Sequence, residues 1–221
     1  MTYFEVGDCG HRVWIEDAWR VLDVGSGQSP HPRADVLLEK FPEDNLHRAG
    51  DAIDRRDPRL VVGDALAMPF PDGAFDYVIA SHIAEHVDDP AAFCREVARV
   101  GRQGYIETPG WLGDMLLRET FHVWRVRRRG GGLDFTAVTN PGPLGPIADI
   151  FYTLVYADIR REGHWTPRSR SPLVRRILAR VRWAMTRLIW APRIRNLMYM
   201  EFEWQRPFPV RVRGRDPDRP A

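Results

Sequence analysis

Between residues 19 and 109, short apolar runs alternate with polar or helical segments. No run exceeds eight residues, the runs are rich in aliphatic and β-branched side chains, and they end near Gly, Asp, Ser or Pro. Such runs are typical of strands buried on both faces, as in a parallel sheet. They occupy residues 19–24, 34–41, 59–64, 75–81 and 103–108.

A helix is predicted over residues 88–100, between the fourth and fifth runs. Asp89 suits an N-cap, and Pro90 suits the first helical position, where its missing N–H needs no partner. Val97 and Val100 then follow helical spacing. Repeated strand–connection–strand units predict an α/β fold with an open, doubly wound and mostly parallel sheet, covered by helices on both faces.

The pattern of the sequence changes after residue 110, where arginine and tryptophan become frequent. Residues 121–138 resemble two strands around a glycine turn, which predicts a hairpin. Residues 172–191 predict a basic amphipathic helix, and residues 197–204 predict a further strand or a lid over an apolar acceptor. We therefore expect a domain at 1–140 and a basic, Arg- and Trp-rich C-terminal extension at 141–221, which serves as a lid, a docking element or a membrane-surface element.

The formal net charge of +2 conceals an imbalance between the two halves. Residues 1–110 hold 11 Lys and Arg against 20 Asp and Glu, a net of −9, whereas residues 111–221 hold 21 Arg against 10 acids, a net of +11. The asymmetry indicates an acidic catalytic body with a basic, partner-facing part. Neutralisation of the two halves across an internal interface explains the same numbers equally well.

The predicted basic helix leaves its partner open. Its apolar face is flanked by arginines, and Trp183 and Trp190 lie on the polar side. Packing of the apolar face on the sheet, or on a second copy in a homodimer, is the first alternative. A basic helix with Trp is also typical of helices that lie on an anionic membrane surface. Nucleic acid is the least favoured partner.

Several classes of protein are disfavoured by composition. The two cysteines, Cys9 and Cys94, exclude a disulfide scaffold and a Cys-rich zinc site, and no metal site is expected. No apolar run reaches 18 residues, and residues 1–17 lack the pattern of a signal peptide. We expect a cytoplasmic protein, with peripheral attachment at the inner membrane face as an option.

Ligands of open α/β sheets bind beyond the carboxyl ends of the strands, so these ends carry the candidate chemistry. The first run ends in Asp23-Val24-Gly25-Ser26-Gly27, whose glycines allow a tight turn and close approach to a ligand. A dinucleotide site would need a third glycine where Pro30 stands. Asp23 would repel a pyrophosphate and would suit a ligand that carries an ammonium group.

Two more acids follow the next two strands. Glu39, at the end of the second run, can bind both hydroxyls of a ribose. After the third run, Asp64 can accept a hydrogen bond from an exocyclic amino group, and the backbone N–H of Ala65 can meet a ring nitrogen. Asp35 is the competitor of Glu39, but it lies at the start of its strand, on the opposite edge of the sheet.

VLDVGSG (21–27) and GDALAMPFPDGAFDYVIASHIAEHV (63–87) resemble motifs of the class I S-adenosylmethionine-dependent methyltransferases, in the small-molecule, methyltransferase type 11-like branch. The resemblance covers residues 19–110, about half of the chain, and implies a Rossmann-like methyltransferase fold with S-adenosyl-L-methionine as cofactor. The chain departs from the family pattern at Ser29, which replaces a third glycine, and at SPHPR (29–33), which replaces the first helix.

The resemblance also implies roles for individual residues. The methionine portion would be surrounded by Asp23, Gly25, Ser26 and Gly27, and the ribose would be held by Glu39. Adenine would be read by Asp64 and Ala65, and the methyl donor would lie beside Ser81 and His82.

A methyltransferase mainly aligns an already activated sulfonium with its acceptor, so a base is needed only when the acceptor arrives protonated. His82 is the first candidate for a catalytic base because histidine titrates near neutral pH. His86, one helical turn further on, fits a structural hydrogen bond better. Glu107 and Thr108, at the end of the fifth run, are candidates to face the acceptor.

The leading hypothesis is therefore a methyltransferase that acts on a small-molecule, lipid or glycan acceptor. A nicotinamide-dependent reductase is disfavoured by Pro30 and Asp23. A non-catalytic cofactor-binding scaffold at a membrane surface keeps the same fold. A nucleic-acid methyltransferase is supported only by the Arg-rich half, since the family's Asn/Asp-Pro-Pro-aromatic signature is absent after the fourth run.

Overall fold

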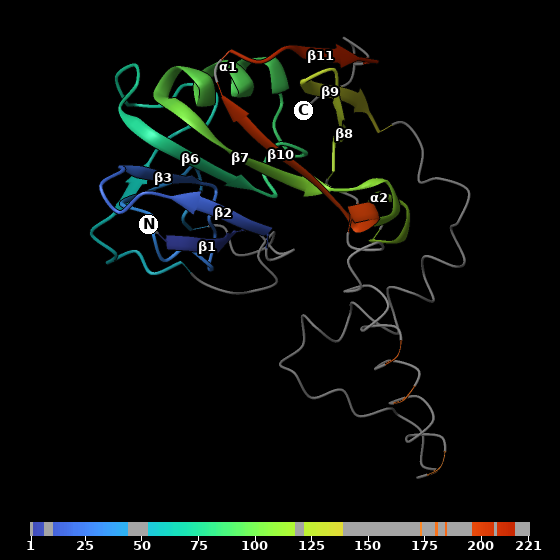
Figure 1. The fold of residues 1–221 in the computed structure, drawn as a ribbon, viewed down its shortest axis with the longest axis horizontal. Helices are drawn as coiled ribbons and strands as arrows, with labels where there is room; N and C mark the ends of the chain where they lie inside the picture. Colours follow the sequence, from blue (N-terminus) through green and yellow to red (C-terminus); the bar gives the residue numbers. More distant parts are fainter. Residues whose placement is uncertain are drawn as a thin grey trace.

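A computed structural model describes residues 2–6, 11–43, 53–117, 122–138, 173, 180, 184, 196–205 and 207–214. Within them, a six-stranded sheet runs through the centre of the protein in the order β10-β7-β6-β3-β4-β5 (Figure 1). Its strands are β3 (Val21–Val24), β4 (Val36–Glu39), β5 (Leu60–Val62), β6 (Phe75–Ser81), β7 (Gly101–Pro109) and β10 (Tyr199–Gln205).

The five strands predicted from the apolar runs are confirmed, and all five are parallel. The strand order reverses at β3, which pairs with β4 through Leu22 and Val36 and with β6 through Leu22 and Val78. In this kind of sheet, the two connections that leave the reversal point in opposite directions open a crevice for a ligand. Here the reversal point is at the carboxyl ends of β3 and β6, where we therefore look for the site.

Helix α1 (Pro90–Val100) confirms the predicted helix between β6 and β7. Asp89 is its N-cap, and its carboxylate accepts hydrogen bonds from the backbone N–H groups of Ala91 and Ala92, at 3.0 and 2.9 Å. Between β3 and β4, by contrast, the chain forms turns and no helix over residues 25–35. Helices on both faces of the sheet are therefore not seen in the described part of the chain, because the two prolines in SPHPR restrict the backbone where a first helix would begin.

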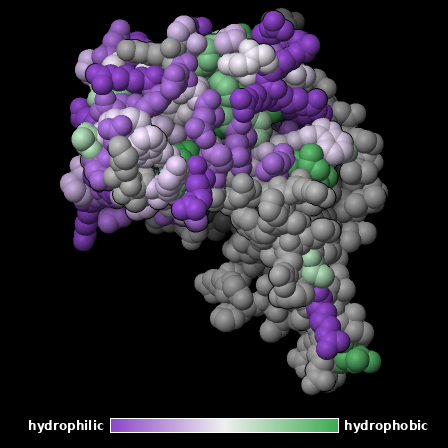
Figure 2. All heavy atoms as spheres, in the orientation of Figure 1, coloured by the Kyte–Doolittle hydropathy of each residue, from purple (hydrophilic) through white to green (hydrophobic). Residues whose placement is uncertain are grey.

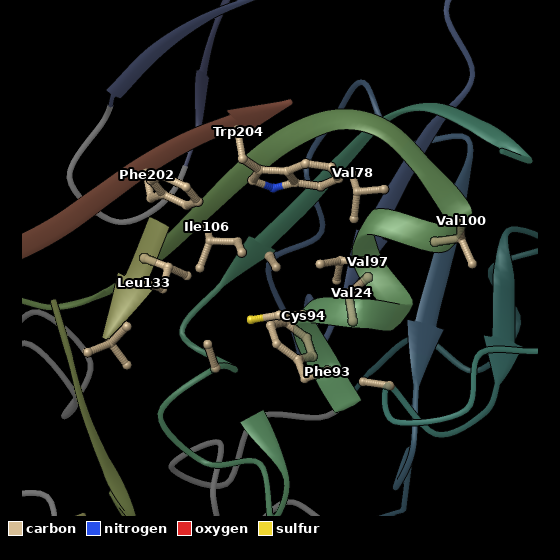
Figure 3. Close-up of a cluster of buried hydrophobic side chains, with 14 of the residues drawn as sticks. Val24, Val78, Phe93, Cys94, Val97, Val100, Ile106, Leu133, Phe202 and Trp204 are labelled. Carbon is tan, nitrogen blue, oxygen red and sulfur yellow. The ribbon is translucent and has the colours of Figure 1, made fainter. Parts of the chain in front are cut away.

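The core lies between the sheet and α1 (Figure 3). Val78 from β6, Ile106 from β7 and Val97 from α1 are all fully buried. The Trp204 ring covers Gly104 of β7, where a Cβ atom would lie 2.8 Å from the ring and 2.1 Å from the Val78 carbonyl oxygen. Glycine at position 104 thus lets a large ring pack directly on the backbone.

Strand β10 confirms the strand predicted near residues 197–204. It pairs antiparallel with β7, and Met200, Phe202 and Trp204 alternate into the core. The chain beyond residue 140 therefore completes the central sheet. The domain division at that residue stays a prediction. The helix at 172–191 also stays a prediction, because all of its residues except 173, 180 and 184 lie outside the described ones.

The predicted hairpin is confirmed as β8 (Trp124–Arg129) and β9 (Gly132–Ala137). A strand near the C-terminus, β11 (Val210–Arg213), pairs parallel with β9 and makes a three-stranded sheet. The sequence pattern did not reveal β11, because a four-residue edge strand with two arginines has no apolar run.

Two further elements were not predicted. A hairpin of β1 (Thr2–Val6) and β2 (His11–Ile15) packs Val13 and Ile15 on the central sheet, and the short helix α2 (Trp111–Leu117) follows β7. Polar side chains cover most of the described part of the face in Figure 2. Among the helices of the described residues, none is long and apolar enough to cross a membrane.

Candidate cofactor and catalytic site

The turn after β3 depends on its glycines. Gly25 and Gly27 have φ angles of +69° and +59°, in the left-handed region that side chains disfavour. The Gly25 N–H donates a 2.8 Å hydrogen bond to the Leu38 carbonyl of β4. A Cβ on Gly25 would lie 2.7 Å from Cδ1 of Ile83, in the segment after β6. The turn is therefore compressed between two neighbouring strand ends.

Glu39 ends β4 and faces this turn. Its carboxylate is buried and accepts hydrogen bonds from the Gly27 N–H and from the Ser26 hydroxyl, the latter at 3.3 Å. The sequence predicted that both strand ends contribute to one site, and the structure places them in direct contact. An acid held against a glycine turn is suitably placed to exchange these donors for the hydroxyls of a ribose.

Asp23 lies one residue before the end of β3 and is also buried. Its carboxylate accepts a 2.8 Å hydrogen bond from the His31 N–H, so the SPHPR segment folds back over it. Burial raises the pKa of Asp23 to about 7, and the negative charge of Glu39 adds to the rise. Near neutral pH this carboxyl group therefore changes charge with small changes in its surroundings.

Asp64 and Ala65 follow β5 at the same edge of the sheet. The Asp64 carboxylate lies 2.8 Å from Lys40 Nζ and accepts a 2.9 Å hydrogen bond from the Leu66 N–H. Burial raises the pKa of Asp64, but these two donors outweigh it and hold the pKa below its ordinary value. Asp64 is thus ionised and oriented, and Ala65 beside it is buried.

Ser81 and His82 follow at the end of β6. His82 has a φ of +54°, an unusual angle for a residue with a side chain. Its N–H donates a 2.9 Å hydrogen bond to the Glu107 carbonyl, which holds this strained turn. The ring nitrogens lie near two carboxylates, with Nδ1 3.1 Å from Glu85 and Nε2 3.2 Å from Glu107. The ring orientation is therefore set from both sides.

Glu107 has a different place from the one expected. It is fully buried, and so is Thr108. Its carboxylate accepts hydrogen bonds from the hydroxyls of Ser81 and Tyr105, at 3.1 and 2.7 Å. It positions the end of β6 rather than facing an open acceptor site. The signal that reveals this is the register, because Ser81 lies opposite Glu107 in the paired strands.

Glu85 is the site residue that sequence reasoning missed. Its side chain is 1% exposed and lies behind the His82 ring. Burial raises the pKa of Glu85, but the hydrogen bond from His82 and the neighbouring histidines outweigh it and hold the pKa below its ordinary value. A glutamate in the spacing His-x-x-Glu-His is a signal that could have indicated a second carboxylate at this turn.

Most of these residues lie in a segment that is similar to a known protein family. Residues 22–106 match the family described as "Methyltransferase domain". Ajmaline N-methyltransferase of Rauvolfia serpentina is 56% identical over 43 residues, which are 20% of this chain and 15% of that protein. Demethylmenaquinone methyltransferase of Renibacterium salmoninarum is 37% identical over 92 residues, 38% of each chain. The chain thus spans less than half the length of these curated relatives.

Solved structures give a similar partial overlap. The YcgJ protein of Bacillus subtilis is 23% identical, with a TM-score of 0.35 over 48% of this chain and 54% of that one. The matched segment begins in β3 and ends within β7, so it contains the carboxyl ends of β3, β4, β5 and β6 but not that of β7. This segment, less than half of the chain, is similar to the methyltransferase domain of S-adenosylmethionine-dependent methyltransferases.

Proposed function

We propose that this protein binds S-adenosylmethionine across the carboxyl ends of β3, β4, β5 and β6 and transfers its methyl group to a small-molecule, lipid or glycan acceptor. The observation that carries the proposal is the contact between Glu39 and the turn from Gly25 to Gly27. A nucleoside site of this fold needs a close-approach turn and a ribose-binding acid at adjacent strand ends.

The charge of the site supports this cofactor over a dinucleotide. Asp23 and Glu39 are buried and close enough for the charge of one to raise the pKa of the other. The methyl donor carries a sulfonium and an ammonium against one carboxylate, so its net charge is positive. A nicotinamide dinucleotide would bring two phosphate charges against these acids, and the repulsion is strong in a buried site.

The chain's own residues have separate tasks in this proposal. Asp23 holds the ammonium group, Glu39 the ribose, and Asp64 with Ala65 the adenine ring. When bound, the cofactor supplies an activated methyl group, so the protein contributes mainly alignment and exclusion of water. His82 is the residue proposed to meet the acceptor, and Glu85 and Glu107 preset its ring.

Calorimetric titration with S-adenosylhomocysteine tests the cofactor assignment, with NADH as the comparison ligand. We expect binding of the first and not of the second. Glu39→Gln is expected to raise the dissociation constant at least about tenfold, since it replaces a charged hydrogen bond worth about 1.5–3 kcal/mol. Glu43→Gln, at an exposed acid, is the matched control and should bind like the parent.

Two results would contradict the assignment. The first is the absence of S-adenosylhomocysteine binding by the folded protein. The second is unchanged binding in Glu39→Gln and in Asp64→Ala, which would place the ligand away from these strand ends.

For the acceptor, the basic surface of the three-stranded sheet β11-β9-β8 supports a molecule or a surface with anionic groups. Exposed arginines project from β8 and β11, and they are Arg127, Arg128, Arg129, Arg211 and Arg213. Flotation of the full chain with phosphatidylglycerol vesicles tests the membrane alternative, with phosphatidylcholine vesicles as control. Recovery of all the protein in the unbound fraction with both lipids would contradict it.

A further inference from the structure

We propose that Glu85, His86 and His122 form a binding site for one divalent transition-metal ion of the Zn²⁺ class. The inference goes beyond the proposed function and does not depend on it. Each of the three residues offers one ligand atom, and these atoms all lie within 4.8 Å of one another. The site lies where the turn after β6 meets the segment that enters β8.

Backbone hydrogen bonds bring the three residues together. The N–H groups of Val123 and Trp124 both donate to the Glu85 carbonyl, at 2.9 and 3.1 Å. The Trp124 indole donates a 2.8 Å hydrogen bond to the Val87 carbonyl. The segment before β8 is therefore anchored on the turn that carries Glu85 and His86. His122 is adjacent to this anchor, so its position does not depend on a freely moving loop.

One carboxylate oxygen of Glu85 is buried without a hydrogen-bond partner in the described part of the chain, and a bound cation would stabilise it. Its Oε1 lies 3.1 Å from His82 Nδ1. Its Oε2 is buried and has no hydrogen-bond partner among the described residues. An ionised oxygen removed from water without a partner costs several kcal/mol unless a positive charge compensates it. Nε2 of His86 lies 3.8 Å from the other oxygen, Oε1, so an ion bound between this carboxylate and the two histidines would supply that charge.

The ligand set is the one that such ions prefer. Two imidazoles and a carboxylate are the protein ligands of many open zinc sites and of the facial iron sites. The rings of His86 and His122 lie at 63° with centroids 4.9 Å apart, so they are not stacked face to face. Tetrahedral zinc needs ligand atoms about 3.3 Å apart, which follows from Zn–N bonds of about 2.0–2.1 Å. The three ligand atoms lie within 4.8 Å of one another, so binding would draw them closer by up to about 1.5 Å.

Asp114 of α2 lies near His122 and would help to orient its ring. Its carboxylate lies 3.8 Å from Nδ1 of His122, and both side chains are 9% exposed. Histidines that bind metals commonly donate their second ring N–H to a carboxylate, which fixes the ring and raises its basicity. In the proposed site, His122 would bind the ion through its other ring nitrogen, Nε2. Three protein ligands leave a further position for water or for an oxygen of another molecule.

The test uses the full chain without an affinity tag, first stripped with EDTA. Titration with ZnCl₂ is expected to show one equivalent of binding and a rise in melting temperature, and Co²⁺ is expected to give the visible absorption of a tetrahedral site. His86→Gln and His122→Gln should each raise the dissociation constant more than tenfold. Asp114→Asn should raise it about 10- to 100-fold, as for other outer-shell partners.

His11→Gln is the matched control. His11 also lies between two carboxylates, Glu201 and Glu203, at 2.9 and 2.7 Å, but outside the proposed site. Its loss should leave zinc binding unchanged. Absence of binding by the parent protein would overturn the proposal, and so would binding that survives both His86→Gln and His122→Gln.

A measurement on the unmutated protein covers the case in which a variant fails to fold. The imidazole resonances of His86 and His122 are expected to shift on addition of Zn²⁺, while those of His11 and His31 stay in place. Shifts confined to other histidines would overturn the assignment. S-adenosylhomocysteine binding is measured separately, so failure of the metal site and failure of the cofactor site give different results.

Discussion

Two buried carboxylates beside one glycine turn dominate the site at the scale of single residues. Asp23 and Glu39 were both predicted from their places at strand ends, and both are less than one-tenth exposed. The sequence could not show that Glu39 contacts the turn itself, because the contact depends on how β4 is registered against β3. The same holds for Glu107, whose burial follows from its place opposite Ser81.

Asp23 should make the stability of the protein depend on pH. Its pKa is about 7 in the folded chain and about 3.8 in the unfolded chain. Between these values the folded state holds the proton more tightly, so stability falls as pH rises from about 4 to 7 and is level outside that window. Asp23→Asn should remove the fall and be more stable than the parent at pH 8, by no more than about 4 kcal/mol.

Urea denaturation at pH 4 and pH 8 measures this difference. The gain of Asp23→Asn over the parent should be small at the lower pH and largest at the higher. Asp72→Asn, at an exposed carboxylate, is the control and should follow the parent at both values. An equal gain at the two pH values would show that the ionisation of Asp23 is not its cause.

Gly25→Ala should weaken cofactor binding more than its cost in backbone strain explains. The added Cβ meets Ile83 at 2.7 Å and also takes a φ of +69°. Gly130→Ala is the matched control, because its φ is +56° but nothing lies within 4 Å of the added atom. Both variants should lose about 1 kcal/mol of stability to strain. Only Gly25→Ala should lower affinity for S-adenosylhomocysteine, and equal affinities would contradict the compressed turn.

At the scale of elements, local pattern was enough wherever a segment is apolar and continuous. The five parallel strands, α1 with its Asp89 cap and the β8–β9 hairpin all lie where the sequence predicted them. The β1–β2 hairpin, α2 and β11 were missed. These elements are short and lie at edges or ends. Packing on a neighbouring element stabilises them there, and their own helix or strand propensity is too weak to predict them.

Trp204 should carry a large share of the stability that β10 contributes. Its ring is 4% exposed and covers Gly104 of β7. Trp204→Ala should cost about 3–5 kcal/mol, because it removes a large buried ring and leaves a cavity against the glycine. Trp14→Ala, at a ring that is 44% exposed, should cost much less. Chemical denaturation of both variants checks this, and similar losses would contradict the packing.

At the scale of the whole molecule, two strands from the C-terminal part of the chain pair with sheets formed by much earlier residues. Strand β10 extends the central sheet and β11 extends the hairpin sheet, although both follow residue 196. A boundary placed at residue 140 from the change in composition therefore separates segments that share a sheet. A change in composition shows where charged residues become frequent, but it does not predict which distant strand a segment pairs with.

A chain that ends at residue 140 should not fold cooperatively. It would lose Met200, Phe202 and Trp204 from the core and leave the apolar side of β7 uncovered. A chain that ends at Gly214 keeps both strands and is the control, so its urea transition should match that of the full chain. A cooperative transition in the shorter chain, with parent-like stability, would show that residues 1–140 are a self-sufficient domain.

The sequence by itself determined the parallel strands, the capped helix, the glycine turn and the acids at successive strand ends. Each depends on residues close together along the chain, where periodicity and turn chemistry act. Only the tertiary structure decided that Glu39 contacts the turn, that Glu107 and Glu85 flank His82, and that His122 joins Glu85 and His86. These contacts depend on strand register and on pairing between distant segments, which no local pattern encodes.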